Sequence, residues 1–373
     1  MPHARASICG IIFCVCLGAL GEEPAPDEFA RALKPYAFSF PKDFGAHPRF
    51  RTEWWYVTGE LETENKDVIG YQATWFRTAL QPQPLAREAS LAARDLFFFH
   101  SALSDVARQK FSFEHKASRG ASTWAGADEG RLRVFFMNRT LERVGENEWR
   151  LLATIDGRKL ELTLTPERAP LLHGEKPGLS PKGPEPGQAS HYVSLSRLRS
   201  EGTLERAPGE APIKVHGRTW FDQEFGSGQL AAGTAGWDWF SVALDDGSDL
   251  MLYRLRKEDA QTLGESSGTY VSPEGARTHL PKDAFQIEVL DTWTSPHTNA
   301  KYPASWKISA PGKELDLEVR PLLPDQELLT TGTTGVNYWE GLCEFTGKIK
   351  GRAVHGRGYV ELVGYAGKFI KGL

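Results

Sequence analysis

Cysteine is scarce in this sequence, and its placement argues against a disulfide framework. Three of the four cysteines (Cys9, Cys14 and Cys16) stand within the first 16 residues, and Cys343 is the fourth. If the N-terminal segment is removed, the lone thiol can form neither an internal disulfide nor a cysteine-based metal site. We therefore expect no disulfide-linked partner, and stability must come from packing.

The sequence also lacks an excess of charge and the common catalytic fingerprints. The formal net charge is -4 over 373 residues, without a long basic run, so no nucleic-acid partner is expected. It contains no Gly-x-Ser-x-Gly, P-loop or Rossmann motif, which leaves acyl transfer and nucleotide chemistry without support. The histidines show no metal-type spacing, and the sequence predicts neither a metal nor a cofactor.

The N-terminus resembles a secretory signal peptide. An apolar run, Ile8 to Leu20, follows His3 and Arg5 and ends in small residues. The run is too short for a comfortable membrane span, so we expect residues 1–21 to be cleaved and the protein to be exported to the periplasm or beyond. The alternatives are a retained anchor or a lipid-modified Cys16, and the absence of a small residue before this cysteine favours cleavage.

A distant internal repeat is the most informative pattern present. One copy runs from Arg51–Leu61 into Ile69–Arg77, and the other runs from Gly236–Leu244 into Leu250–Arg256. Each copy has an aromatic-acid opening, an alternating strand, a tight turn and a return strand with an arginine at its end. Such a repeat predicts two copies of one β module.

Further short segments with period-two alternation fill the chain between turns rich in Gly and Asn. Without crossover helices between them, they predict an all-β protein of two tandem antiparallel barrels. We expect a leader at 22–46, a first domain at 47–228 and a second domain at 229–373. Residues 166–187, dense in Pro and Gly, predict a long loop inside the first domain.

Four ordered motifs support the same fold by resemblance. They are Thr52–Gly59, Trp220–Gly226, Gly236–Phe240 and Gly358–Tyr365. The chain is similar, from about His47 to Tyr365, to the lipocalin-like family that contains carotenoid 1,2-hydratase (hydroxyneurosporene synthase) and the AttH-type secreted proteins. The resemblance implies tandem lipocalin-like barrels, and fungal hydratases and pericyclases belong to the same family.

The middle motif departs from the carotenoid hydratases. Those enzymes carry the version Trp-x-Asp-His-Glu-Trp, whereas Gln223 and Phe225 stand at its His and second Trp here. Gln cannot shuttle protons near neutral pH as His can. The chain is therefore closer to the AttH-type branch.

Hydratase chemistry would require a carboxylic acid that stays protonated in an apolar pocket, together with aromatic faces that stabilise a carbocation. The candidate catalytic acids are Glu53, Asp222, Glu224 and Asp238. Aromatic side chains are expected to bind an apolar small molecule, because apolar cavities with few polar groups are typical ligand sites. The ligand-binding candidates are Trp54, Trp55, Trp75, Tyr192, Trp237, Trp239 and Tyr253.

Each acid also has a purely structural alternative. Glu53 could pair with Arg77 and close the end of the first barrel. Strand alternation places Asp238 on the opposite face from Trp237 and Trp239, unless the strand is bulged. Asp222 could simply form a turn, and Glu224 could be solvated.

Three functions remain open from the sequence. The first is a carrier of an isoprenoid, carotenoid or lipid, and the second is a hydratase acting on such a molecule. The third is an accessory protein that associates with membrane transporter components, as AttH-type proteins resemble neighbours of transporters. An open cavity with a carboxylate at its wall would favour the hydratase. An open cavity without a buried acid would favour the carrier, and barrels filled by side chains would favour the accessory protein.

Overall fold

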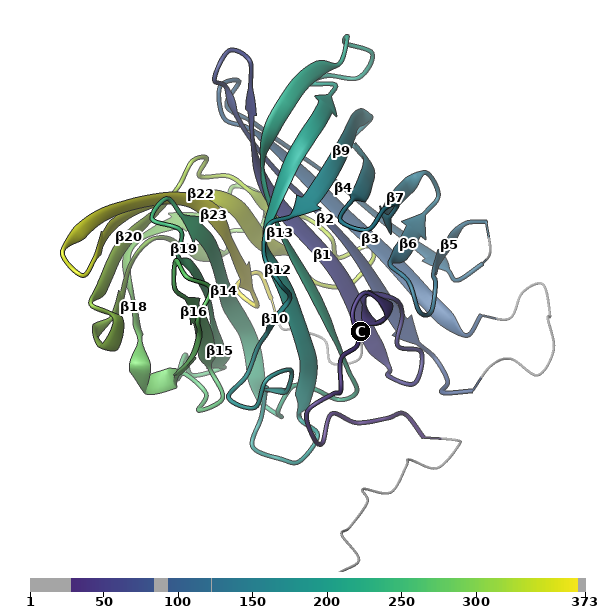
Figure 1. Ribbon diagram of the computed structural model, residues 1–373, viewed down its shortest axis with the longest axis horizontal. Coiled ribbons are helices and arrows are strands. Elements are labelled where there is room, and N and C mark those ends of the chain that lie inside the picture. The colour runs from purple at the N-terminus through teal and green to yellow at the C-terminus, as the bar shows by residue number, and fades with distance from the viewer. Residues whose placement is uncertain (1–27, 84–92, 122, 368–373) are drawn as a thin grey trace, which may run out of the picture.

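The computed structural model describes residues 28–83, 93–121 and 123–367 of this chain. The predicted signal peptide at 1–21 lies outside these residues. The described residues form an antiparallel all-β protein with two sheets, one of 13 and one of 10 strands (Figure 1). Three short 3-10 segments accompany them: η1 (Lys42–Phe44), η2 (Lys282–Ala284) and η3 (Pro311–Lys313).

The first sheet follows the order β4-β3-β2-β1-β13-β12-β9-β8-β7-β6-β5, and β10 and β11 also pair with β12. Its strands are β1 (Thr52–Thr63), β2 (Val68–Ala79), β3 (Asp95–Asp105), β4 (Lys110–Arg119), β5 (Ala125–Ala127), β6 (Arg133–Phe136), β7 (Arg139–Arg143), β8 (Trp149–Ile155), β9 (Arg158–Pro166), β10 (Leu171–Leu172), β11 (Ser180–Pro181), β12 (Ala189–Leu204) and β13 (Ile213–Gly226).

The second sheet follows the order β17-β16-β15-β14-β23-β22-β20-β19-β18, and β21 pairs with β22. Its strands are β14 (Thr234–Leu244), β15 (Asp249–Lys257), β16 (Ser267–Val271), β17 (Arg277–Pro281), β18 (Gln286–Thr294), β19 (Lys301–Ala310), β20 (Leu315–Pro321), β21 (Glu327–Leu328), β22 (Tyr338–Ile349) and β23 (Arg352–Val363).

The predicted fold class is confirmed: one sheet forms a nearly closed barrel and the other a half-barrel. The two sheets also repeat the same local arrangement, since β1 lies between β2 and β13 as β14 lies between β15 and β23. The two copies of the sequence repeat form equivalent strand pairs, β1 with β2 and β14 with β15. In the expected loop at 166–187, the structure adds the two-residue strands β10 and β11.

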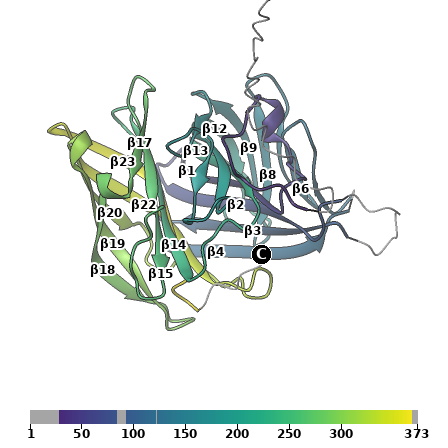
Figure 2. The same cartoon turned by 90° about the horizontal axis from the view of Figure 1, so that it is seen from below.

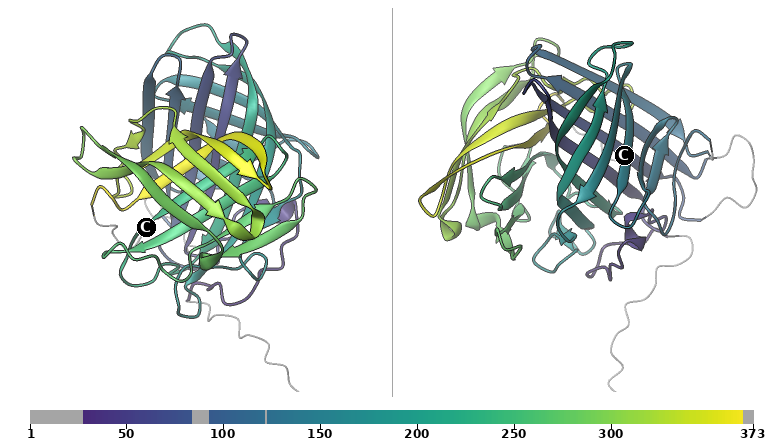
Figure 3. Two further views of the ribbon diagram at one scale, coloured as in Figure 1. Left: turned by 90° about the vertical axis from the view of Figure 1, so that its left-hand side faces the viewer. Right: turned by 45° about the horizontal axis from the view of Figure 1, so that its top comes forward.

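The two sheets lie side by side, each curled around its own core (Figures 2 and 3). Buried Trp55, Trp75 and Phe221 belong to the first core, and Phe240 and Trp306 belong to the second. Where β1, β12 and β2 approach β23, β14 and β22, a third aromatic cluster fills the interface. Its buried members are Tyr56, Tyr192, Trp220, Trp239, Met251, Tyr253, Leu255, Leu263, Leu342 and Tyr359.

The described part of the leader packs on the first sheet. The Ala30 amide donates to the Arg49 carbonyl at 2.9 Å, and Ala32 forms an isolated bridge with Gly187. Phe44 enters the first core, where its ring lies 5.0 Å from that of Trp149. The leader therefore covers one part of the first core.

Across residues 28–83, 93–121 and 123–367, none of the helical segments has the length and hydrophobicity that a membrane crossing requires.

Candidate active site between the two sheets

Strand alternation divides the predicted site residues between two faces. On β1, Trp54 and Tyr56 join the aromatic cluster between the sheets, whereas Trp55 belongs to the first core. On β14, Trp237 and Trp239 face the interface, and Asp238 turns the other way to meet arginines. A period of two sends neighbouring side chains to opposite faces, so residues adjacent in sequence serve different environments.

Asp222 lies at the interface and is 3% exposed. Its carboxylate accepts hydrogen bonds from Tyr192 Oη at 2.6 Å, from Trp220 Nε1 at 2.7 Å and from Ser194 Oγ. The Tyr192 hydroxyl accepts in turn from Trp239 Nε1 at 3.0 Å. Burial raises the pKa of the Asp222 carboxyl to about 7 despite these donors. Asp222 is thus an acid that can hold a proton at neutral pH.

Glu224 belongs to the same face of β13 but has a cation as its partner. Lys182 Nζ lies 3.1 Å from Glu224 Oε1, and Ser190 Oγ also donates to this carboxylate. Burial alone would lower the pKa of the Lys182 ammonium, but Glu224, together with Tyr253 and Asp222, outweighs burial and the pKa is raised. The ammonium stands 3.9 Å from the ring centroid of Tyr253. Glu224 is therefore the counter-ion of a buried lysine.

The second sheet contributes two acids that the sequence analysis did not single out. Glu340 on β22 and Glu361 on β23 are direct cross-strand partners. Tyr56 Oη donates to Glu340 Oε1 at 2.5 Å, and Trp237 Nε1 donates to Glu361 Oε2 at 2.8 Å. The available signal was a glutamate within an apolar stretch of each closing strand, Tyr338–Cys343 and Gly358–Val363.

Both carboxyls of this pair favour the protonated form. Burial, followed by the negative charge of Glu361, raises the pKa of Glu340 well above its ordinary value. Burial raises the pKa of Glu361 to about 7, and the nearby charges of Asp222 and Glu224 act in the same direction. The interface therefore holds several acids that favour keeping their protons near neutral pH.

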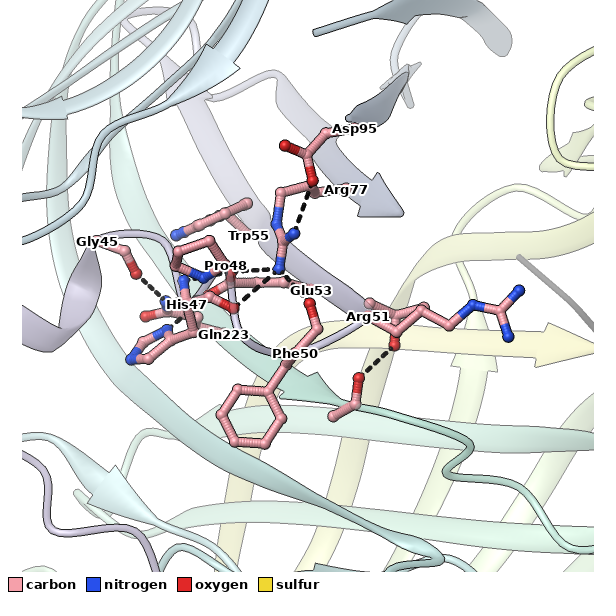
Figure 4. A network of polar contacts seen from close by, with 12 residues as sticks. Gly45, His47, Pro48, Phe50, Arg51, Glu53, Trp55, Arg77, Asp95 and Gln223 are labelled. Carbon is pink, nitrogen blue, oxygen red and sulfur yellow. Dashed lines mark hydrogen bonds and ion pairs between the residues drawn. The ribbon is translucent and has the colours of Figure 1, made fainter. Parts of the chain in front are cut away.

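Glu53 lies outside this interface, in a closed polar network (Figure 4). It accepts from His47 Nδ1 at 2.7 Å and from Gln223 Nε2 at 3.0 Å, and Arg77 Nη2 lies 3.4 Å from its Oε2. Burial alone would raise its pKa, but His47 and then Arg77 outweigh burial, and the pKa is lowered. Glu53 thus forms the ion pair that the sequence allowed as an alternative and stays ionised.

Asp238 occupies the corresponding position in the second sheet. Arg254 Nε donates to its Oδ2 at 3.0 Å, and Arg256 Nε donates to its Oδ1 at 2.9 Å. Tyr365 Oη donates at 3.0 Å to the same Oδ1. Two guanidinium groups hold this carboxylate, on the face away from Trp237 and Trp239.

The ligand-binding candidates separate in the same way. Trp55 and Trp75 are fully buried in the first core, and Trp55 Nε1 donates to the Phe44 carbonyl at 3.0 Å. Neither indole reaches the interface. The other ligand-binding candidates lie in the interface cluster or pack against it: Trp54, Tyr192, Trp237, Trp239 and Tyr253. Of these, Trp54 and Trp237 are only half-buried.

The interface is closely packed. A cavity of about 30 Å³ lies along it, with Trp220, Ser241 and Tyr359 among its lining residues. That is room for about one water molecule. A larger ligand must therefore displace side chains, and the half-buried indoles are the ones that have solvent on one side.

No group of three or more His, Cys, Asp and Glu side chains suited to a metal ion occurs among the described residues. The carboxylates at the interface instead meet hydroxyls, indoles and one lysine. What this arrangement offers chemically is proton transfer in an apolar, aromatic setting.

Fold and site together define a lipocalin-like protein of two curled β sheets with acids and indoles between them. The chain belongs to the AttH-like family, whose model matches residues 31–365. A protein assigned as an AttH in Nitrosomonas europaea has a similar crystal structure, with a TM-score of 0.81 and 34% identity. That similarity covers 90% of this chain and 100% of the other.

A sequence relative and a solved structure, both named kievitone hydratase, are also similar. The protein from Fusarium solani subsp. phaseoli is 26% identical over 181 residues, which are 45% of this chain and 47% of the relative. The match thus spans about half the length of that hydratase. The crystal structure of kievitone hydratase from Nectria haematococca shares the fold, with a TM-score of 0.69 at 16% identity over 92% of this chain and 98% of the other.

Proposed function

We propose that this protein binds a hydrophobic small molecule between its two sheets and adds water to a carbon–carbon double bond of that molecule. The observation that carries the proposal is the group of protonatable acids beside indoles at the interface, with the pKa of buried Asp222 at about 7. Protonating an unactivated alkene requires such an acid. The similarity to a kievitone hydratase supports the same class of reaction.

The reaction would proceed in two steps. A carboxyl O–H gives its proton to one alkene carbon, the π bond breaks and a tertiary carbocation forms. The π faces of Trp54, Trp237 and Trp239 would stabilise that positive charge. Water then forms the C–O bond and returns a proton to the carboxylate, so that the net change is the addition of one water.

The substrate class that fits is an isoprenoid or a related lipid with a branched alkene. Position 223 adds no acid to this reaction, because Gln223 Nε2 donates to the Gly45 carbonyl at 2.9 Å and to Glu53 on the face away from Asp222. The proton donor of the proposed reaction is therefore an acid at the interface and not a residue of the Glu53 network.

The proposal is tested by finding the ligand and then following water. Purified protein is incubated with a cell lipid extract, and the compounds retained are identified by mass spectrometry. Each retained alkene, with lycopene and squalene as added probes, is then incubated in isotopically labelled water. We expect a product that carries one labelled hydroxyl. If none of these compounds gains water, the hydratase function is wrong.

The packed interiors of the two sheets favour a second candidate, a non-catalytic accessory protein that contacts membrane transporter components. The same purification separates the two proposals. Retention of a membrane protein without any retained alkene would support the accessory role. Export is part of both, and N-terminal sequencing of the mature protein would show whether residues 1–21 are removed.

A further inference from the structure

The two acids on β22 and β23, Glu340 and Glu361, lie opposite each other across the strand pair. Glu340 is 1% exposed and Glu361 is half-buried, and their backbones are directly opposed. Their bonds to Tyr56 and Trp237 place both carboxylates at the interface. Directly opposed residues have Cβ atoms about 5 Å apart, so two negative charges there repel in a dry setting.

No arginine or lysine of the described ranges forms an ion pair with either carboxylate. The neighbouring groups are instead acids and phenols, which add no positive charge. Lys182 is committed to Glu224. Besides burial, the charges of Asp222 and Glu224 on β13 raise the pKa of Glu361. Burial and then the charge of Glu340 in turn raise the pKa of three tyrosines, Tyr56 on β1, Tyr338 on β22 and Tyr359 on β23.

We propose, resting on the hydratase function above, that Glu361 is the catalytic acid that protonates the alkene and that Glu340 is a positioning residue that keeps a proton on the pair. Glu361 is preferred to Asp222 because three donors enclose the Asp222 carboxylate. Glu361 accepts from Trp237 at Oε2, which leaves Oε1 able to carry the proton. Glu361 and Trp237 are both half-buried and are joined by this hydrogen bond, so the acid lies directly beside an indole that keeps some exposure to solvent.

In this step the Glu361 O–H bond breaks, a C–H bond forms and the alkene π electrons leave a cation at the neighbouring carbon. Water attacks the cation, and the proton that it loses returns to the Glu361 carboxylate. Glu340 retains its own proton throughout and donates a hydrogen bond to the newly charged Glu361. The pair ends the cycle as it began.

The shared proton can be measured without any ligand. Carbon-13 NMR of protein labelled at the glutamate side-chain carboxyls is recorded across a pH titration, and the two signals are assigned from Glu340→Gln and Glu361→Gln. We expect the pair to lose its first proton near pH 7 and its second at higher pH. In Glu361→Gln, the Glu340 titration should move down, because the charge that opposed its ionisation is gone. Titration of both groups near the ordinary value of about 4.3 would overturn the shared proton.

Turnover of lycopene or squalene tests the catalytic assignment. Glu361→Gln should lower turnover about 100-fold or more, the usual contribution of a general acid, and Glu361→Asp should restore part of it. Wild-type turnover should fall as the pH rises through about 7, where Glu361 loses its proton. Glu340→Gln should lower turnover below pH 7 less than Glu361→Gln does, because its side-chain amide can still donate a hydrogen bond to the Glu361 carboxylate. Glu344→Gln is the matched control, since this residue lies on the same strand but pairs with exposed His355 at 3.1 Å.

The outcomes separate the two proposals. A wild type that hydrates a probe together with a fully active Glu361→Gln variant overturns the assignment and leaves the hydratase function standing. A wild type that leaves every probe unchanged removes the hydratase function and the catalytic role with it. The NMR titration still decides in that case whether the two carboxyls share a proton.

Discussion

Glu53 and Arg77 are directly opposed on β1 and β2, and Arg77 Nη2 lies 3.4 Å from Glu53 Oε2. The second sheet repeats this relationship, because Asp238 and Arg254 are directly opposed on β14 and β15 and form an ion pair. In both sheets the acid points away from the interface. The repeated pair is therefore a structural element of the module, and the chemistry lies on the other face of the same strands.

Arg77→Met should lower the free energy of unfolding by about 3–5 kcal/mol, because it removes a buried guanidinium that pairs with both Glu53 and Asp95. Urea denaturation measures the loss, and adding Glu53→Gln should recover part of it. Arg320→Met is the control, since Arg320 and Glu318 form an exposed pair expected to contribute less than about 1 kcal/mol. Equal losses in the two variants would contradict the buried role.

Asp222→Asn should flatten the dependence of stability on pH. The folded pKa of Asp222, about 7, exceeds its ordinary value of 3.8, so the native state binds the proton more tightly than the unfolded state. That contribution is present in full below about pH 4 and is lost as the pH rises to 7, in total roughly 4 kcal/mol. Urea midpoints at several pH values should therefore fall more steeply in the wild type than in the variant. Parallel curves would contradict the raised pKa.

Gly358→Ala should disrupt the pairing of β14 with β23. A Cβ at this position would stand 1.9 Å from the Ser241 carbonyl oxygen, which strand pairing holds in place. Overpacking of this kind costs about 1–3 kcal/mol, and thermal unfolding should show it. At Gly312 a Cβ would meet nothing within 4 Å, so Gly312→Ala should leave the melting temperature nearly unchanged. A tolerated Gly358→Ala would show that the strands can separate locally.

Asp249→Asn should loosen the contact between the two sheets. The Asp249 carboxylate on β15 accepts hydrogen bonds from two arginines of the first sheet's chain segment, from Arg197 Nε at 2.6 Å and from Arg168 Nη1 at 2.7 Å. Removing its charge leaves buried Arg197 without its partner, at a cost of about 3 kcal/mol. Limited proteolysis of the connection at 227–233 should become faster. Asp316→Asn, on an exposed position of β20, should leave the cleavage rate as in the wild type.

The strands and their repetition could be predicted because their signals are local. Alternation and turn residues identify a strand from a few neighbours, and two similar boxes identify a duplication. The same alternation correctly placed Asp238 on the face away from Trp237 and Trp239. The pairing of Glu53 with Arg77 also follows from two strands joined by a tight turn.

The composition of the interface could not be predicted in this way. Tyr56 and Glu340 are 284 residues apart in sequence yet form a hydrogen bond of 2.5 Å. Trp55 and Trp75 have the same chemistry as Trp54 and Trp239, but the face of the strand sends them into a packed core. Which aromatic residues surround an acid depends on how two sheets dock, and no short segment encodes that.

By itself, the sequence determined that this chain would build two copies of an antiparallel β module, because backbone pairing and side-chain alternation act over a few residues. Only the tertiary structure decided that Asp222, Glu340 and Glu361 would lie between the copies and that Glu53 and Asp238 would not. The physical reason is burial. A carboxyl keeps its proton or loses it according to the charges and the water that the docked sheets leave around it.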